Sequence, residues 1–200
     1  MVRTGQGPGR PRDSEIDEAV LGAARELLAE VGYAAVTMDA AAARAGTSKA
    51  AIYRRYRSKA ELLFAAAVHS PAPAPTADTG SLAGDLAALA RRVLSDMTTP
   101  AAREVAPQVV AEVARSPEAA RRLRDVFVSG ERAEVDAVLD RATGRGELPT
   151  RPDVATVHRV LGGALFFSVF VIGEEPDEAA LADVVDLLVA GLTTRSTLPS

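Results

Sequence analysis

Apolar residues recur at intervals of three and four positions near the start of the chain, between residues 14 and 31. This spacing places them on one face of an α-helix, so it predicts a helix over 14–31 with one buried side. Gly32 follows directly and is expected to end the helix, because glycine is favoured just after a helix C-terminus. The stripe consists of Ile16, Ala19, Val20, Ala23, Ala24, Leu27, Leu28 and Val31.

Three shorter helices are predicted to follow, each opened by a residue that can cap it. Thr37 is a suitable N-cap for the first, and either Thr47 or Ser48 can cap the second. Gly46 lies between these two helices and is expected to break the chain direction there. The segment 58–61, with the sequence Ser-Lys-Ala-Glu, is a capping box that opens the last helix. The first two helices are expected over residues 38–45 and 49–56.

The rest of the chain predicts five longer helices and no strand, because no segment alternates between apolar and polar residues for long. Pro71, Pro73 and Pro75 mark a boundary before these helices. We therefore expect an all-α fold of about nine helices in three parts: a flexible basic arm over 1–12, a first domain over 13–70 and a second over 80–200. The longer helices are predicted over residues 82–97, 101–114, 117–141, 154–172 and 178–194.

Charge is distributed unevenly between the two domains. The chain carries a net charge of -4, yet residues 44–59 hold six basic side chains and no acidic one. Two tyrosines are interleaved with them. Such a local excess of positive charge is typical of a surface that binds a polyanion such as DNA. The six residues are Arg44, Lys49, Arg54, Arg55, Arg57 and Lys59.

The two short helices around Gly46, the second of them basic, have the pattern of a helix-turn-helix motif. Helical spacing turns Ile52 and Tyr56 inward together. Hydroxyl groups and lysine suit phosphate contacts, whereas arginine can read guanine edges. Residues left to meet DNA are Thr47, Ser48, Lys49, Tyr53, Arg54 and Arg55. In the arm, Arg10 and Arg12 resemble the core of an AT-hook segment, which suits a narrow minor groove.

Composition excludes several other classes. The chain has no cysteine and only two histidines, His69 and His158, far apart in the sequence. It has no glycine-rich phosphate loop, HExxH motif or nucleophile elbow. We therefore expect no enzyme, no cofactor and no metal site. The polar start and the absence of a run of 18 apolar residues predict a cytoplasmic protein without a membrane span.

Spaced motifs over about 50 residues resemble the TetR/AcrR family of transcriptional regulators. The motifs are Ala23-Ala24, Leu27-Leu28, Gly32-Tyr33, Thr37, Ala45-Gly46-Thr47-Ser48-Lys49, Ile52-Tyr53 and Ser58-Lys59-Ala60-Glu61-Leu62-Leu63. The resemblance implies DNA contacts at Thr37, Ser48, Lys49, Tyr53 and Lys59. The chain departs from the family pattern at Ala41, where a larger aliphatic residue is common, and at Arg55-Tyr56, which replace a common His-Phe pair.

The resemblance also implies that the second domain binds a small molecule and forms a homodimer. The expected effector is apolar or amphipathic. We expect the protein to be a repressor that binds a palindromic operator and that the effector releases from it. Candidate ligand-lining residues are Phe64, Leu86, Leu89, Val109, Val110, Val113, Phe127, His158, Phe166 and Phe170. Candidate dimer-interface residues form two apolar stripes: Val157, Leu161, Leu165, Val169 and Ile172, then Leu181, Val184, Val185, Leu188 and Leu192.

Two alternatives remain open at this point. A sequence-independent architectural protein would also use the basic arm and the basic helix, and its affinity would fall steeply with salt. A DNA-binding regulator without any ligand response would have the same sequence features in its first domain. The acidic second domain speaks against an architectural role, because DNA compaction does not need it.

Overall fold

The computed structural model describes residues 10–68 and 76–194, and every regular element in these two ranges is a helix. Contacts between residues divide the chain into two compact units, residues 1–71 and residues 72–200. Each unit has its own buried apolar core and is described separately.

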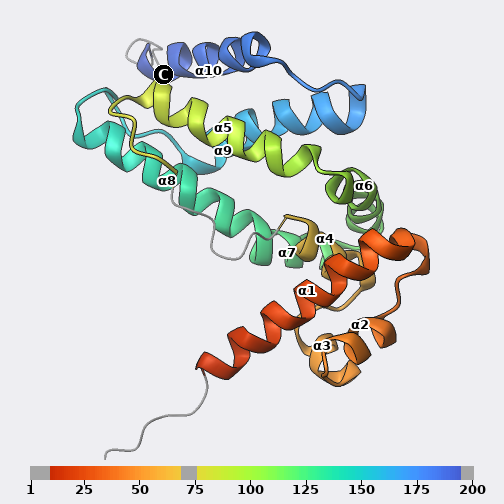
Figure 1. Ribbon diagram of the computed structural model, residues 1–200. Helices are drawn as coiled ribbons and strands as arrows, with labels where there is room; N and C mark the ends of the chain where they lie inside the picture. The colour runs from red at the N-terminus through yellow and green to blue at the C-terminus, as the bar shows by residue number, and fades with distance from the viewer. Residues whose placement is uncertain (1–9, 69–75, 195–200) are drawn as a thin grey trace, which may run out of the picture. The chain divides into compact units, whose positions relative to one another are not determined.

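The N-terminal unit contains four helices (Figure 1): α1 (Arg10–Ala35), α2 (Met38–Arg44), α3 (Lys49–Arg55) and α4 (Lys59–Val68). The long α1 packs against α4 and α2, and α2 packs against α3. Apolar side chains from all four helices meet in the core, as the spacing of the predicted stripe requires. Its most buried members include Val20, Ala24, Ala41, Ile52, Leu62 and Leu63.

The beginning of α1 differs from the prediction, whereas its end agrees with it. The helix begins at Arg10 rather than at residue 14, so residues 10–12 are helical and not part of an extended arm. Pro11 is compatible with this because a helix tolerates proline in its first turn. The rest of the predicted arm, 1–9, lies outside the described residues. At Gly32 the backbone leaves the helical region with φ 72°, which interrupts the helix where the sequence predicted.

The C-terminal unit is built around α5, which packs against α8, α9 and α10. Figure 1 shows these four helices stacked side by side. Their buried faces share one core, which includes Leu86, Val138, Leu139, Leu161 and Leu165. The elements of this unit are α5 (Leu82–Thr98), α6 (Pro100–Arg115), α7 (Pro117–Leu123), η1 (Arg124–Val128), α8 (Ser129–Gly144), α9 (Val154–Phe166), η2 (Phe167–Ile172) and α10 (Glu178–Thr193).

Two of the predicted long helices contain a turn of π-helix. The helix predicted over 117–141 is α7, η1 and α8 in succession, and the helix predicted over 154–172 is α9 followed by η2. A π-turn adds one residue to a helical turn, which the average apolar spacing does not reveal. The predicted helix starts are confirmed, because Ser116, Asp153 and Asp177 each accept a hydrogen bond from a backbone N–H three residues further on.

A buried carboxylate joins the start of α5 to the end of α8. Asp85 is fully buried and accepts hydrogen bonds from Nε of Arg141 at 3.1 Å and from Nη2 of Arg145 at 3.2 Å. Thr79 donates both its backbone N–H and its hydroxyl to the same carboxylate, at 2.7 and 2.8 Å. Burial alone disfavours the ionised form, but these hydrogen bonds outweigh it and lower the pKa of Asp85 below its ordinary value.

We predict that Asp85→Asn lowers the free energy of unfolding at neutral pH by on the order of 3 kcal/mol, because two arginines lose their buried anion. Since the folded pKa is the lower one, the contribution of ionised Asp85 is complete above the unfolded pKa of about 3.9. It is lost as the pH falls through the folded pKa. Urea unfolding followed by circular dichroism across this pH range measures both effects.

Asp78→Asn is the matched control. Asp78 also pairs with Arg145, at 3.1 Å, but its side chain is 62% exposed. Its replacement is expected to cost less than about 1 kcal/mol. Equal losses for the two variants would contradict the central role of Asp85.

Candidate nucleic-acid interface

The turn between α2 and α3 is closed by hydrogen bonds at the end of α2. The N–H of Thr47 donates to the carbonyl of Ala42 at 3.0 Å, and the N–H of Gly46 donates to that of Ala43 at 3.3 Å. This pair of bonds is a Schellman motif, which needs a left-handed residue after the helix. Gly46 supplies it with φ 63°. The predicted helix-turn-helix is therefore present, with α3 as its second helix.

Both short helices are capped by hydroxyl groups. Oγ1 of Thr37 accepts from the N–H of Ala40 at 3.1 Å, and Oγ of Ser48 accepts from the N–H of Ala51 at 3.1 Å. Ser48, and not Thr47, is thus the cap of α3. Each hydroxyl retains its own hydrogen, which a phosphate oxygen could accept. Thr37 and Ser48 are both exposed.

The two faces of α3 separate as predicted. Ala51 and Ile52 are buried on the inner face, and Tyr56 is buried just beyond the helix. Burial raises the pKa of Tyr56 to about 12, so its hydroxyl stays protonated. On the outer side, Lys49, Tyr53 and Arg54 are exposed. Hydroxyl, ammonium and guanidinium groups therefore share one exposed surface, which we call the α3 outer face.

Part of the basic run is engaged inside the unit. Nη2 of Arg44 lies 2.7 Å from the carboxylate of Glu30, and Nε of Arg55 lies 2.7 Å from that of Asp17. Both acids belong to α1. The side chain of Arg55 is only 18% exposed. This placement speaks against its predicted role as a base reader: Arg55 holds α3 to α1.

Lys59 also contacts α1, although the family resemblance predicts that it binds phosphate. Its Nζ donates to the carbonyls of Tyr33 at 2.8 Å and Ala34 at 3.1 Å. The same ammonium lies 4.4 Å from the centre of the Tyr33 ring, a cation–π contact. Two of its three N–H groups are used in this way. Lys59 therefore fixes the chain just after the Gly32 break, and only its third N–H remains for another acceptor.

Lys49 pairs with an acidic residue on the exposed surface. Its Nζ lies 2.8 Å from Oδ2 of Asp39, and both side chains are largely exposed. The hydrogen bond from Lys49 to Asp39 raises the pKa of Lys49. An exposed ion pair of this kind is weak, so a phosphate can replace Asp39 as the partner of Lys49. Asp39 had no place in the sequence-based site.

In the described part of the C-terminal unit, two of the predicted ligand-lining residues share a cavity. Leu89 and His158 line a space of about 30 Å³ between α5, α8 and α9, enough for one or two water molecules. Phe166 and Phe170 contact each other with ring centres 4.9 Å apart. Leu86 and Val109 are buried, Val113 and Phe127 are half-buried, Val110 is exposed, and Phe64 belongs to α4 of the N-terminal unit.

Most residues of the predicted dimer stripes lie inside the protomer. Eight of the ten are buried there and form part of its core. Only Ile172 and Val184 retain appreciable exposure. A different set of large apolar side chains lies exposed on α9, η2 and α10: Val160, Phe167, Val171 and Leu187. We call this set, together with Ile172, the exposed apolar face.

The segment Val154–Ile172 is long and apolar enough to cross a membrane by length and composition, with a mean hydropathy of 1.7, and 22% of it is buried. Length and composition alone are weak grounds for a membrane span. Here they reflect a helix that is apolar on two sides, one in the core and one on the exposed apolar face.

We predict that Arg55 and Asp17 are energetically coupled. Arg55→Gln and Asp17→Asn should each lower the stability of the N-terminal unit, with a coupling energy of about 1 kcal/mol in a double-mutant cycle. Arg54 lies next to Arg55 but on the α3 outer face, so Arg54→Gln is the control and should show no coupling to Asp17→Asn. Chemical denaturation of the four proteins in each cycle gives their free energies of unfolding, and from these the coupling energy. A coupling energy near zero would contradict this role, and Arg55 would again be a candidate for DNA contact.

Comparisons with known proteins agree with this architecture. A family described as bacterial regulatory proteins, tetR family, matches residues 20–66, and a family described as tetracyclin repressor-like, C-terminal domain, matches residues 76–188. An uncharacterized HTH-type transcriptional regulator of Mycobacterium tuberculosis is 33% identical over 195 residues, which cover 97% of this chain and 94% of that protein.

Two further relatives extend the comparison. A DNA-binding transcriptional repressor TetR of Mycobacteroides abscessus is 32% identical over 174 residues, covering 84% of this chain and 88% of that protein. The crystal structure of the TetR family transcription regulator SCO0332 superimposes with a TM-score of 0.75 at 25% identity, covering 92% of this chain and all of that one. Proteins of this family are DNA-binding regulators and not enzymes. The chain thus belongs to the TetR family of transcriptional regulators, and residues 20–66 contain its DNA-binding helix-turn-helix.

Proposed function

We propose that this protein is a homodimeric, cytoplasmic repressor that binds a palindromic DNA operator and is released by a small apolar or amphipathic molecule. The observation that carries the DNA-binding part is the α3 outer face. It gathers Lys49, Tyr53 and Arg54 next to the exposed caps Thr37 and Ser48, on a helix held by a helix-turn-helix. A helix of this kind places its first residues in the major groove.

Different roles follow from the chemistry of these groups. The hydroxyls of Thr37, Ser48 and Tyr53 contact phosphates, and Lys49 exchanges Asp39 for a phosphate. Arg54 reads a base edge, because its guanidinium can donate two parallel hydrogen bonds to guanine. Arg10 and Arg12 stay candidates for DNA contact, but they begin α1 and are not part of an extended arm.

The exposed apolar face supports the homodimer. Large apolar side chains exposed on neighbouring helices mark a candidate interaction site, and Leu187 is 76% exposed. A second copy of the same chain is the natural partner, because a two-fold axis brings an identical apolar face opposite this one. A dimer also supplies the second α3 that a palindromic operator requires.

Release by a ligand follows from linkage between two binding sites. A molecule that prefers the conformation with misplaced α3 helices weakens DNA binding by the ratio of its affinities for the two conformations. A relative of similar length is named a repressor, which supports repression over activation. An architectural protein or a regulator without ligand response would show no such coupling.

We predict that Lys49→Gln weakens binding to every DNA sequence and reduces the slope of affinity against salt by about one unit. Arg54→Gln should instead reduce discrimination at one base pair, by about 1–3 kcal/mol. Fluorescence anisotropy with the intergenic DNA upstream of the gene, and with a shuffled sequence, measures both at several salt concentrations. Arg115→Gln, an exposed arginine of α6, serves as the control. Equal affinity of the wild-type protein for both DNAs would favour the architectural alternative.

We predict that Leu187→Asp converts the dimer to a monomer and lowers operator affinity at least tenfold. Because Leu187 is largely exposed in the protomer, the substitution should leave the protomer folded. Light scattering after size-exclusion chromatography measures the mass, and circular dichroism checks the fold. Ala133→Asp, at an exposed position of α8, is the control. An unchanged mass for Leu187→Asp would remove this face from the proposed interface.

A further inference from the structure

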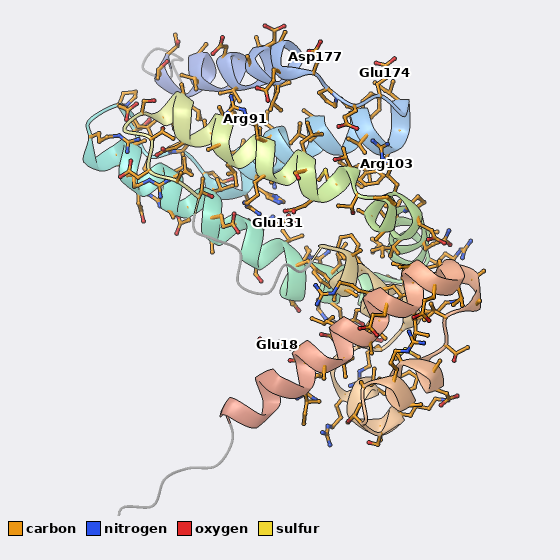
Figure 2. All side chains as sticks on the ribbon, in the orientation of Figure 1. Glu18, Arg91, Arg103, Glu131, Glu174 and Asp177 are labelled. Carbon is orange, nitrogen blue, oxygen red and sulfur yellow. The ribbon has the colours of Figure 1, made fainter. Side chains whose placement is uncertain are left out.

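The cavity between α5, α8 and α9 is apolar except at one side. Its apolar wall comes from Leu89, Val93, Met97, Val135 and Leu161. Its polar side consists of Arg92 on α5, Glu131 on α8 and His158 on α9 (Figure 2 labels Glu131). An apolar pocket with a few convergent polar groups is the usual form of a small-molecule site.

Two buried nitrogen atoms of this polar side have no hydrogen-bond partner among the described residues. They are Nε of Arg92 and Nδ1 of His158. Leaving such atoms unpaired in the interior is costly, so their presence calls for an explanation. Both side chains line the same cavity, and a bound molecule in that cavity would be their common partner.

The chemical character of each nitrogen follows from its surroundings. Nε2 of His158 lies 2.7 Å from the carboxylate of Glu131, which can only accept, so Nε2 carries the hydrogen. In the neutral ring, Nδ1 is then an acceptor. Nε of Arg92 is always a donor. Two residues that line the cavity therefore carry one unpaired donor, on Arg92, and one unpaired acceptor, on His158.

Charge around the cavity selects against ionic ligands. Arg92 is already paired with Glu134 and with Asp96, the latter at 3.3 Å. With Glu131 included, three carboxylates lie around one guanidinium and one imidazole, which disfavours an anion. An ammonium ion has no lone pair to accept from Nε of Arg92. A neutral hydroxyl group both accepts and donates, so it satisfies both nitrogen atoms.

We propose that this cavity binds a small neutral molecule with a hydroxyl group on an apolar body, a phenol or a short alcohol. The hydroxyl oxygen accepts from Nε of Arg92, and its hydrogen is donated to Nδ1 of His158. The proposal names the effector class for the ligand response proposed above and rests on that function only for the release of DNA. Binding itself is a property of the protein alone.

Admission of such a molecule requires the cavity to widen. The space of about 30 Å³ is well below the ~150 Å³ of an apolar cavity known to hold benzene. Met97 is half-buried, unbranched and adaptable, so its rearrangement can provide room. Gly162 contributes no side chain to the wall, and a Cβ built there would lie 3.9 Å from Nε2 of His158, an ordinary contact.

The first experiment compares ligands and leaves the protein unchanged. Isothermal titration calorimetry of the full chain at neutral pH uses phenol, toluene, anisole, benzoate and benzylamine. Phenol is expected to bind at least tenfold more tightly than each of the other four. Anisole can only accept, and toluene can do neither. Binding of any of the other four compounds as tight as that of phenol, or no binding of phenol, would overturn the proposal.

The second experiment locates the site. Gly162→Ala adds a methyl group to the cavity wall without a clash and should weaken phenol binding at least fivefold. Gly130→Ala, in α8 with open space around its Cβ, is the matched control and should leave it unchanged. Unaltered phenol affinity in Gly162→Ala would place the binding elsewhere and overturn this assignment.

The role in DNA release is measured separately, by anisotropy of labelled upstream DNA with and without phenol. Tight phenol binding without a loss of DNA affinity would support the cavity and overturn the proposed release mechanism. Loss of DNA affinity that Gly162→Ala abolishes would support both.

Discussion

The N-terminal unit depends on the attachment of its basic residues to α1. Arg44 and Arg55 pair with acids of α1, and Lys59 donates to two carbonyls just after the Gly32 break. These contacts join α2, α3 and the start of α4 to the same helix. A small domain with a core rich in alanine buries little apolar area. Polar contacts at its edges therefore help to hold α3 in its orientation. The cations that hold this frame are thereby largely withdrawn from the surface offered to DNA.

The surface proposed to contact DNA, the α3 outer face, carries fewer cations than the whole basic run over residues 44–59. The α3 outer face combines hydroxyl caps, one lysine with an exchangeable acidic partner and one exposed arginine. Phosphate contacts of this type position a protein, and a single arginine adds base discrimination. Asp39 pairs with Lys49 at 2.8 Å on the surface of the motif, and an exposed pair of this kind is weak enough for another anion to replace Asp39.

The C-terminal unit uses α9 in three ways at once. One side of α9 enters the core through Val157, Leu161 and Leu165. Another side carries Val160 on the exposed apolar face, which continues into η2 with Phe167. His158 and Gly162 line the cavity. A shift of α9 caused by a molecule in the cavity would therefore reach the surface proposed to pair two copies. Asp85 joins the start of α5 to the end of α8, two of the helices that line the cavity.

Local interactions made much of the structure predictable from the sequence. Caps at Thr37 and Ser116, and the glycine turn at Gly46, involve residues a few positions apart, so the sequence predicts them. For α3 the sequence offered both Thr47 and Ser48, and the structure shows that Ser48 is the cap. The π-turns and the early start of α1 were missed because neither disturbs the average apolar period. Only the tertiary structure decided which basic side chains are engaged within the unit. Lys59 donates to Tyr33, 26 residues earlier in the chain, and Arg55 pairs with Asp17. The tertiary structure also decided which apolar stripe of α9 and α10 faces inward. A helix that is apolar on two sides has no periodic signal for its core face, and only packing against α5 and α8 distinguishes them.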